Sequence, residues 1–90
     1  MFRLWGKLVK GSKTLRDTVI EDSSSDTRTH KILNGLTEIC YQFDLSVPIW
    51  LDSNIADFKH HKKTRFTSDN FIDSIEFDFL ELSVLEEDGY

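Results

Sequence analysis

The chain has 90 residues, of which 39% are apolar, 12% are aromatic and 30% are charged. Sixteen acidic and eleven basic side chains give a formal net charge of −5. This composition excludes a disordered tail, a collagen-like chain and a nucleic-acid module recognised from its bulk charge. The length predicts a single compact domain over residues 1–90, in which 86–90 form a frayed acidic tail.

The cellular location is predicted from what the sequence lacks. A single cysteine excludes a disulfide framework within the chain. No run of about 18 apolar residues is present, so no membrane-spanning segment is predicted. Charges interrupt the apolar residues of 1–10, which is not the pattern of a secretory signal. These features predict a cytoplasmic protein that keeps its cysteine reduced.

The first two elements are predicted to form a hairpin. Residues alternate in character from Phe2 onward, and this period of two predicts a strand over about 2–10. Gly11 begins a short turn, and the β-branched residues of 14–20 predict the returning strand. A polar loop over 21–25 is predicted to connect the hairpin to the next element.

The longest helical pattern follows this loop. Apolar residues recur on a single stripe, which consists of Ile32, Leu36, Ile39, Cys40 and Phe43. The stripe predicts a helix over about 27–43, with Lys31 on the outward face and with Asp26 or Thr27 as the N-cap. Because Cys40 belongs to the stripe, we expect it to be a core residue rather than a nucleophile.

A shorter helix is predicted over about 53–62. The Asp-Ser pair at 52–53 offers an N-cap, and Ile55 and Phe58 are expected to share the buried face. The apolar segment 47–51 precedes this helix and contains the one proline. That segment is predicted either to plug the edge of the core or to form a minor strand.

The C-terminal part of the chain carries the longest strand pattern. After a brief strand over 64–67, apolar residues alternate from Ile75 to Phe79 and then shift phase by one residue. A bulge or strong bend is therefore predicted near Phe79–Leu80. The element order predicts an α+β fold, in which the N-terminal hairpin and the C-terminal strand form an antiparallel sheet with two helices packed on one face.

Charge is distributed in blocks along the chain. The net charges are +5 over 1–16, −4 over 17–26, −2 over 27–58, +4 over 59–66 and −8 over 67–90. Arg3 and Lys7 are predicted on the outward face of the first strand. Glu76 and Asp78 are predicted on the outward face of the last strand. Since opposite charges stabilise neighbouring strands, we expect these two strands to be adjacent in the sheet.

Two basic segments are candidate anion or nucleic-acid sites. The first consists of Lys59, Lys62, Lys63 and Arg65, whose charges neutralise phosphates, with Phe66 as a base-stacking residue. The second consists of Arg28 and His30 at the start of the first helix, where free N–H groups attract anions. The alternatives are a solvated helix end for the first segment and ordinary helix capping for the second.

Catalytic and metal sites are not predicted. The sequence contains no glycine-rich phosphate loop, no Ser-His-Asp motif and no paired-carboxylate motif. The adjacent His60 and His61 point about 100° apart on a helix, which does not suit one metal ion. An enzyme that uses His30 or His61 as an acid or base stays as an alternative, and no cofactor is expected.

Trp5 and Val9 are candidate interface residues on the outward face of the first strand. Apolar residues there predict a patch that a second subunit or a partner covers. The alternative is that Trp5 packs on the stems of Arg3 and Lys7. The leading prediction is a non-enzymatic protein-binding module, or a homodimer formed through the sheet. Nucleic-acid binding is the alternative, and the net charge disfavours it.

Five segments resemble those of a family of short uncharacterised bacterial proteins. These segments are Asp17–Ile20, Asp26–Ile32, Glu38–Tyr41, Pro48–Asp52 and Lys63–Phe66. The similarity covers nearly the whole chain. The resemblance implies a stand-alone cytoplasmic protein rather than a fragment of an enzyme, and it implies no activity, cofactor or catalytic residue.

Overall fold

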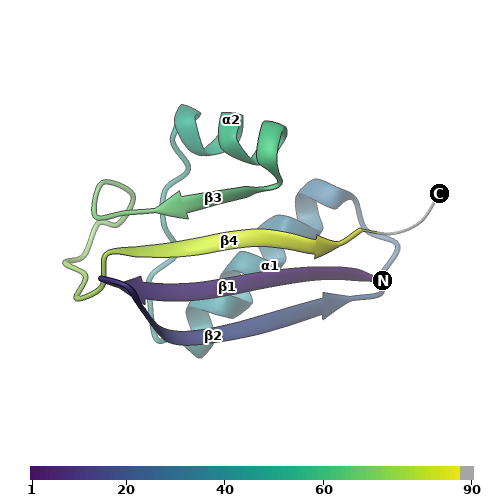
Figure 1. Cartoon of the computed structure of the whole chain (residues 1–90). Helices are drawn as coiled ribbons and strands as arrows, with labels where there is room; N and C mark the ends of the chain where they lie inside the picture. Colours follow the sequence, from purple (N-terminus) through teal and green to yellow (C-terminus); the bar gives the residue numbers. More distant parts are fainter. Residues whose placement is uncertain (88–90) are drawn as a thin grey trace.

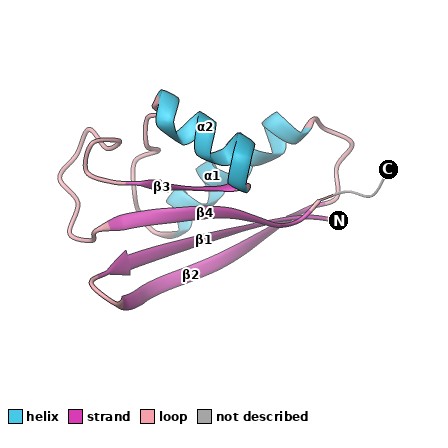
Figure 2. Ribbon diagram, turned by 45° about the horizontal axis from the view of Figure 1, so that its top comes forward, coloured by secondary structure: helices cyan, strands magenta, loops and turns pink. Residues whose placement is uncertain are grey.

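Six elements follow one another along the chain. The computed structural model describes residues 1–87, and the elements are β1 Phe2–Lys10, β2 Lys13–Asp22, α1 Arg28–Gln42, α2 Asp52–His61, β3 Lys63–Phe66 and β4 Phe79–Glu86. The strands form one antiparallel sheet in the order β2-β1-β4-β3 (Figure 1). Both helices lie on the same face of this sheet (Figure 2). The predicted α+β fold is confirmed.

The first strand divides its side chains between the two faces of the sheet. Phe2, Leu4 and Leu8 are buried on the helix side, as their alternation predicts. Residues between them point to the opposite face and are half-buried. Gly11 closes the β1–β2 hairpin with a φ of 61°, a left-handed conformation that glycine adopts without steric cost.

Two glycines allow α1 to lie close to β1. A Cβ atom placed on Gly6 of β1 would lie 2.6 Å from the Cγ2 atom of Ile39 in α1. A Cβ atom placed on Gly35 of α1 would lie 2.6 Å from the Cδ2 atom of Leu4 in β1. Both distances are shorter than carbon–carbon contact allows, so the two glycines determine how closely the helix packs.

The first helix buries the predicted stripe and one lysine besides. Thr27 is the N-cap, and its Oγ1 atom accepts a hydrogen bond from the backbone N–H of His30 at 3.2 Å. Lys31, which the stripe places outward, is instead only 3% exposed. Its ammonium group lies 6.0 Å from the ring centroid of Phe2. The prediction for Lys31 was wrong because its stem covers the end of β1.

An aromatic cluster joins α2 to the sheet. Trp50 meets Phe58 of α2 and Phe66 of β3 edge to face, with centroid separations of 5.7 and 5.0 Å. The segment 47–51 therefore plugs the core edge and forms no strand in the described structure. Phe66 is fully buried in this cluster, so it is not the exposed stacking residue that the sequence suggested.

The start of α2 differs from the prediction. The cap residue is Leu51, whose backbone N–H donates to the Oδ1 atom of Asn54 at 3.0 Å. Asp52 and Ser53 therefore lie within the first turn. Ile55 was expected in the core but is 54% exposed, because α2 turns Asn54 and Phe58 inward instead.

The last strand begins later than the sequence suggested. β4 starts at Phe79, and residues 75–78 belong to the preceding loop. In that loop Phe77 meets Phe71 edge to face at 5.7 Å, which accounts for its apolar pattern. Of the predicted bulge or strong bend near Phe79–Leu80, the structure has the bend, since the chain bends at residues 76–78, and no bulge lies at Phe79–Leu80. The register of β1 and β4 shifts instead between Arg3 and Leu4, at the far end of β4.

The first two residues of the predicted acidic tail make defined contacts in the structure. Glu86 is the last residue of β4, and Glu87 makes two ion pairs with basic residues. Residues 88–90 of that tail lie outside the described residues. Within residues 1–87, no helix is long and apolar enough to cross a membrane.

Candidate functional site

The face of the sheet opposite the helices carries the predicted interface residues. Trp5 and Val9 are half-buried on this open face, which neither helix covers (Figure 2). The indole Nε1 of Trp5 donates to the Oδ2 atom of Asp17 at 2.9 Å, and the ammonium group of Lys7 lies 4.7 Å from the Trp5 ring. Trp5 is therefore on the outward face as predicted, and it also packs against Lys7 as the alternative proposed.

Ion pairs cross the open face between β1 and its neighbours. β1 and β4 are adjacent, as the charge pattern predicts, but the acidic partners differ. Lys7 pairs with Glu81 at 3.2 Å, and Arg3 pairs with Glu86 at 3.9 Å. Asp78 precedes β4, and its Oδ2 atom accepts instead from the N–H of Gly11 at 2.6 Å. The prediction that Glu76 and Asp78 are the acidic partners was wrong, because β4 starts after both residues.

The basic segment 59–65 is divided between two neighbouring elements. Lys59 lies in the last turn of α2, while Lys63 and Arg65 lie on β3. The guanidinium of Arg65 is 3.7 Å from the Glu81 carboxylate and 4.4 Å from the ring centroid of Phe79. Lys62 is likewise paired with Glu87, so two of the four basic residues have carboxylate partners.

Glu87 brings the two predicted basic segments together. Its carboxylate forms ion pairs with Arg28, at the start of α1, and with Lys62, which follows α2, at 2.8 Å in the latter case. Hydrogen bonds from Lys62 and Arg28 lower the pKa of Glu87, so this carboxylate stays ionised at neutral pH. Sequence reasoning missed Glu87 because an acidic run near a chain end is usually solvated.

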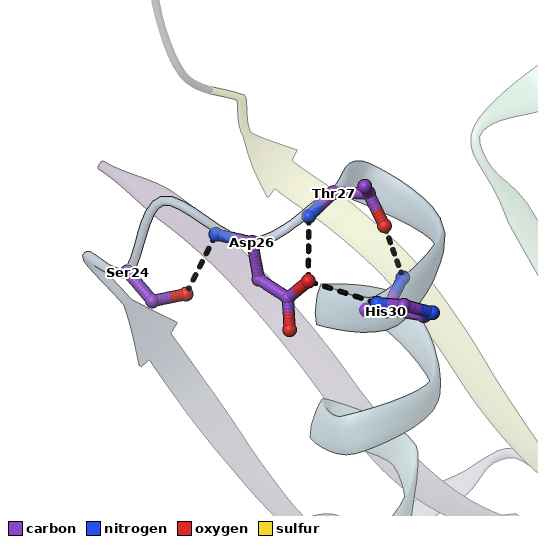
Figure 3. A network of polar contacts seen from close by, with 4 residues as sticks. All are labelled: Ser24, Asp26, Thr27 and His30. Atoms are coloured by element: carbon purple, nitrogen blue, oxygen red, sulfur yellow. Dashed lines mark hydrogen bonds and ion pairs between the residues drawn. The ribbon is translucent and has the colours of Figure 1, made fainter.

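His30 belongs to the cap of α1. Its Nδ1 atom lies 2.8 Å from the Oδ1 atom of Asp26, which also accepts from the backbone N–H of Thr27 (Figure 3). The hydrogen bond from His30, together with that from Thr27, lowers the pKa of Asp26. The capping interpretation is confirmed for Thr27, and the Asp26 carboxylate lies where an external anion would approach.

His61 lines a small polar cavity of about 220 Å³ beside β3. The cavity is lined by Asp57, His61, Lys63, Thr64, Arg65 and Glu81. The Thr64 hydroxyl donates to Asp57 at 3.2 Å. Within residues 1–87 the His61 ring makes no hydrogen bond. Likewise, no cluster of three or more metal-ligating side chains is found in the described chain.

A groove with a volume of about 430 Å³ lies between α1 and α2. It is lined by Arg28, Thr29, Ile32 and Leu33 from α1, by Trp50, and by Ile55, Phe58 and Lys59 from α2. Leu33 and Ile55 are 43% and 54% exposed. The sequence signal for this groove was Leu33, an apolar residue outside the buried stripe of α1.

The outer edge of β2 is the second exposed feature. β2 has ten residues and forms one edge of the sheet, whereas β3 at the other edge has four (Figure 1). Leu15 and Val19 of β2 are exposed. On the helix side, Arg16 donates to the carbonyl oxygen of Gln42, and Thr18 donates to the side chain of the same residue. These bonds hold β2 to α1 without covering its outer edge.

Comparison of the chain with protein-family models, with curated proteins and with solved structures finds no match. The functional interpretation therefore rests on the chemistry and geometry of the surfaces of the chain.

Cys40 is expected to be chemically inert in the folded protein. It is buried in α1, and this burial raises the pKa of its thiol to about 11. The thiolate is the reactive form, so a disulfide reagent at about pH 8 should modify the native protein far more slowly than the urea-unfolded protein. The modification is measured by absorbance. Equal rates of modification for the native and the unfolded protein would contradict this placement of Cys40 in the core.

Proposed function

We propose that this protein is a non-enzymatic, self-associating module that forms a homodimer by pairing β2 with β2 of a second copy. The observation that carries the proposal is the long outer edge of β2. An edge strand presents a row of backbone N–H and C=O groups that another strand can pair with. Edge strands are normally shortened, bulged or covered. β3 is shortened at the opposite edge, and β2 has a bulge at Leu15 near its turn but is regular over residues 16–22.

The charges of β2 favour a second copy as the partner. Its first half is basic, with Lys13 and Arg16, and its second half is acidic, with Asp17, Glu21 and Asp22. Antiparallel pairing of two identical strands places the basic half of each beside the acidic half of the other. A two-fold symmetric interface requires this kind of self-complementarity.

A register centred on Thr18 is consistent with the faces of β2 beyond its bulge. If Thr18 lies opposite Thr18 of the second copy, residues 16–20 of the same face stay together on both sides of the sheet. Arg16 then lies diagonally across from Asp22, and Asp17 lies directly opposite Val19. Because Val19 pairs with Trp5 in the β1–β2 register, the predicted interface residue Trp5 lies one strand inside the new junction.

The ion pairs of the basic residues support self-association over nucleic-acid binding. Four of the six basic candidates already have a carboxylate partner, namely Arg28, His30, Lys62 and Arg65. A nucleic-acid backbone would have to displace these carboxylates while meeting a net negative chain. We place the module in the cytoplasm, where its single cysteine stays reduced.

Two substitutions of Val19 test the dimer and its register. Val19→Asp sets an acid opposite Asp17 twice in the proposed dimer, whereas Val19→Lys sets an opposite charge there. By sedimentation velocity at micromolar concentrations, we expect wild type and Val19→Lys to be dimers and Val19→Asp to be a monomer. Circular dichroism verifies that both variants are folded. A strictly monomeric wild type, or equal dimerisation of the two variants, would refute the proposal.

A further inference from the structure

We infer that the groove between α1 and α2 binds an acidic peptide segment that inserts large apolar side chains between the two helices. The groove lies on the helix side of the sheet and shares no residue with the β2 edge. The inference therefore goes beyond the proposed dimer and stands or falls independently of it.

The floor and walls of the groove provide the apolar part of the site. Ile32 and Phe58 are buried and form the floor, together with the half-buried Trp50. Leu33 and Ile55 stand on the two walls, and roughly half of each side chain is exposed. A concave surface with exposed aliphatic residues on both sides is typical of grooves that accept the apolar face of a helix. Its volume suits a few inserted side chains.

The rim of the groove provides the charge complementarity. Arg28 lies on the α1 side, with its guanidinium 6.0 Å from the ring centroid of Phe58, and Lys59 lies on the α2 side. Lys59 has no ion-pair partner within the part of the chain that the structure describes. The rim thus carries two cations above an apolar floor, namely Arg28, which is paired with Glu87, and Lys59. This arrangement favours a ligand that combines carboxylates with apolar side chains.

Glu87 identifies the class of the ligand. Its carboxylate is already paired with Arg28, which lines the rim, and with Lys62, which follows α2 and lies outside the lining. A carboxylate delivered by a peptide chain thus satisfies these two cations. An acidic peptide would present the same group, so Glu87 acts as an internal competitor for part of the site. A nucleic acid has no large apolar side chains to fill the floor of the groove, so the apolar lining favours a peptide.

The probe is a fluorescein-labelled amphipathic helical peptide with leucine on one face and glutamate on the other. Fluorescence anisotropy should give saturable binding to the full chain at micromolar concentrations. A peptide with alanine in place of leucine, and one with lysine in place of glutamate, should each bind at least about tenfold more weakly. Equal binding of either control peptide would overturn the inference.

Protein variants locate the binding on the groove. Ile55→Asp and Lys59→Glu should each weaken binding at least about tenfold. Ile72→Asp and Lys10→Glu are matched controls, because both residues are exposed outside the groove, and they should leave binding unchanged. Leu33→Asp provides a second groove variant if Ile55→Asp proves unstable by circular dichroism. Binding that is unaffected by the groove variants would overturn the inference.

Removing the internal competitor should strengthen binding. Glu87→Gln frees Arg28 and Lys62 without changing the groove, so the acidic peptide should bind severalfold more tightly. Absence of saturable binding to this variant would overturn the inference. Binding of phosphatidylglycerol vesicles, with the same sensitivity to Ile55→Asp and without peptide binding, would overturn the assignment of a peptide ligand.

Discussion

Replacing Asn54 with alanine is expected to lower the free energy of unfolding by about 3 kcal/mol. The Asn54 amide is buried and uses both ends of its side chain. Its Oδ1 atom accepts from the Leu51 N–H at 3.0 Å and from Asn70 at 2.7 Å. Its Nδ2 atom donates to the Thr64 hydroxyl at 2.9 Å and to the Arg65 carbonyl at 3.0 Å. One side chain thus connects α2, β3 and the loop after β3.

The expected loss in the free energy of unfolding follows from the polar groups that lose a hydrogen-bond partner in Asn54→Ala. Each buried polar group that loses its partner costs about 1–3 kcal/mol, and several groups lose one here. Thr64 and Asn70 retain other partners, Asp57 and the Ile49 carbonyl respectively, so the loss stays below the full sum.

Urea unfolding followed by tryptophan fluorescence measures the change. The matched control is Asn34→Ala, because Asn34 is exposed on α1 and alanine favours the helix, so its effect should stay within about 0.5 kcal/mol. A loss for Asn54→Ala as small as that of the control would show that the network does not stabilise the fold. If Asn54→Ala lowers the free energy of unfolding as expected, it should also weaken peptide binding, since this network holds the α2 wall of the groove.

Gly6→Ala is expected to destabilise the protein by about 1–3 kcal/mol, although alanine suits a strand better than glycine. The added methyl group would lie 2.6, 2.8 and 3.2 Å from three atoms of Ile39, which is fully buried. Because Ile39 is branched at Cβ and packed on all sides, it cannot turn away without disturbing the core. The helix and the strand must therefore move apart.

A double-mutant cycle with Ile39→Ala separates this clash from other effects. Ile39→Ala should cost about 2–5 kcal/mol in the wild type but clearly less in the Gly6→Ala background, because the new methyl group fills part of the space. Gly11→Asn is the control, since asparagine tolerates a positive φ and no atom lies within 4 Å of a Cβ there. Additive effects of Gly6→Ala and Ile39→Ala would contradict the proposed contact.

The local periodicity of the sequence was sufficient to predict much of the fold. The alternation in β1 and the stripe on α1 each follow from the burial of one face, and a buried face leaves its period in the sequence. The charge pattern also predicted that β1 and β4 are neighbours. The prediction failed for apolar residues that do not belong to the buried face of a helix or strand. Phe77 pairs with a loop ring rather than extending β4, and Ile55 lines a groove rather than the core.

The sequence determined the kinds and order of the elements, because the hydrophobic periodicity of each element involves only residues that are close together in the sequence. The net charge of −5 was least informative, since three of the six basic candidates, Arg28, Lys62 and Arg65, lie against acids that are far away in the chain. Tertiary structure alone decided that Arg28 and Lys62 share Glu87, that α1 and α2 enclose a groove, and that β2 keeps an open edge. These features depend on strand order and helix packing, which bring distant residues together and have no local period.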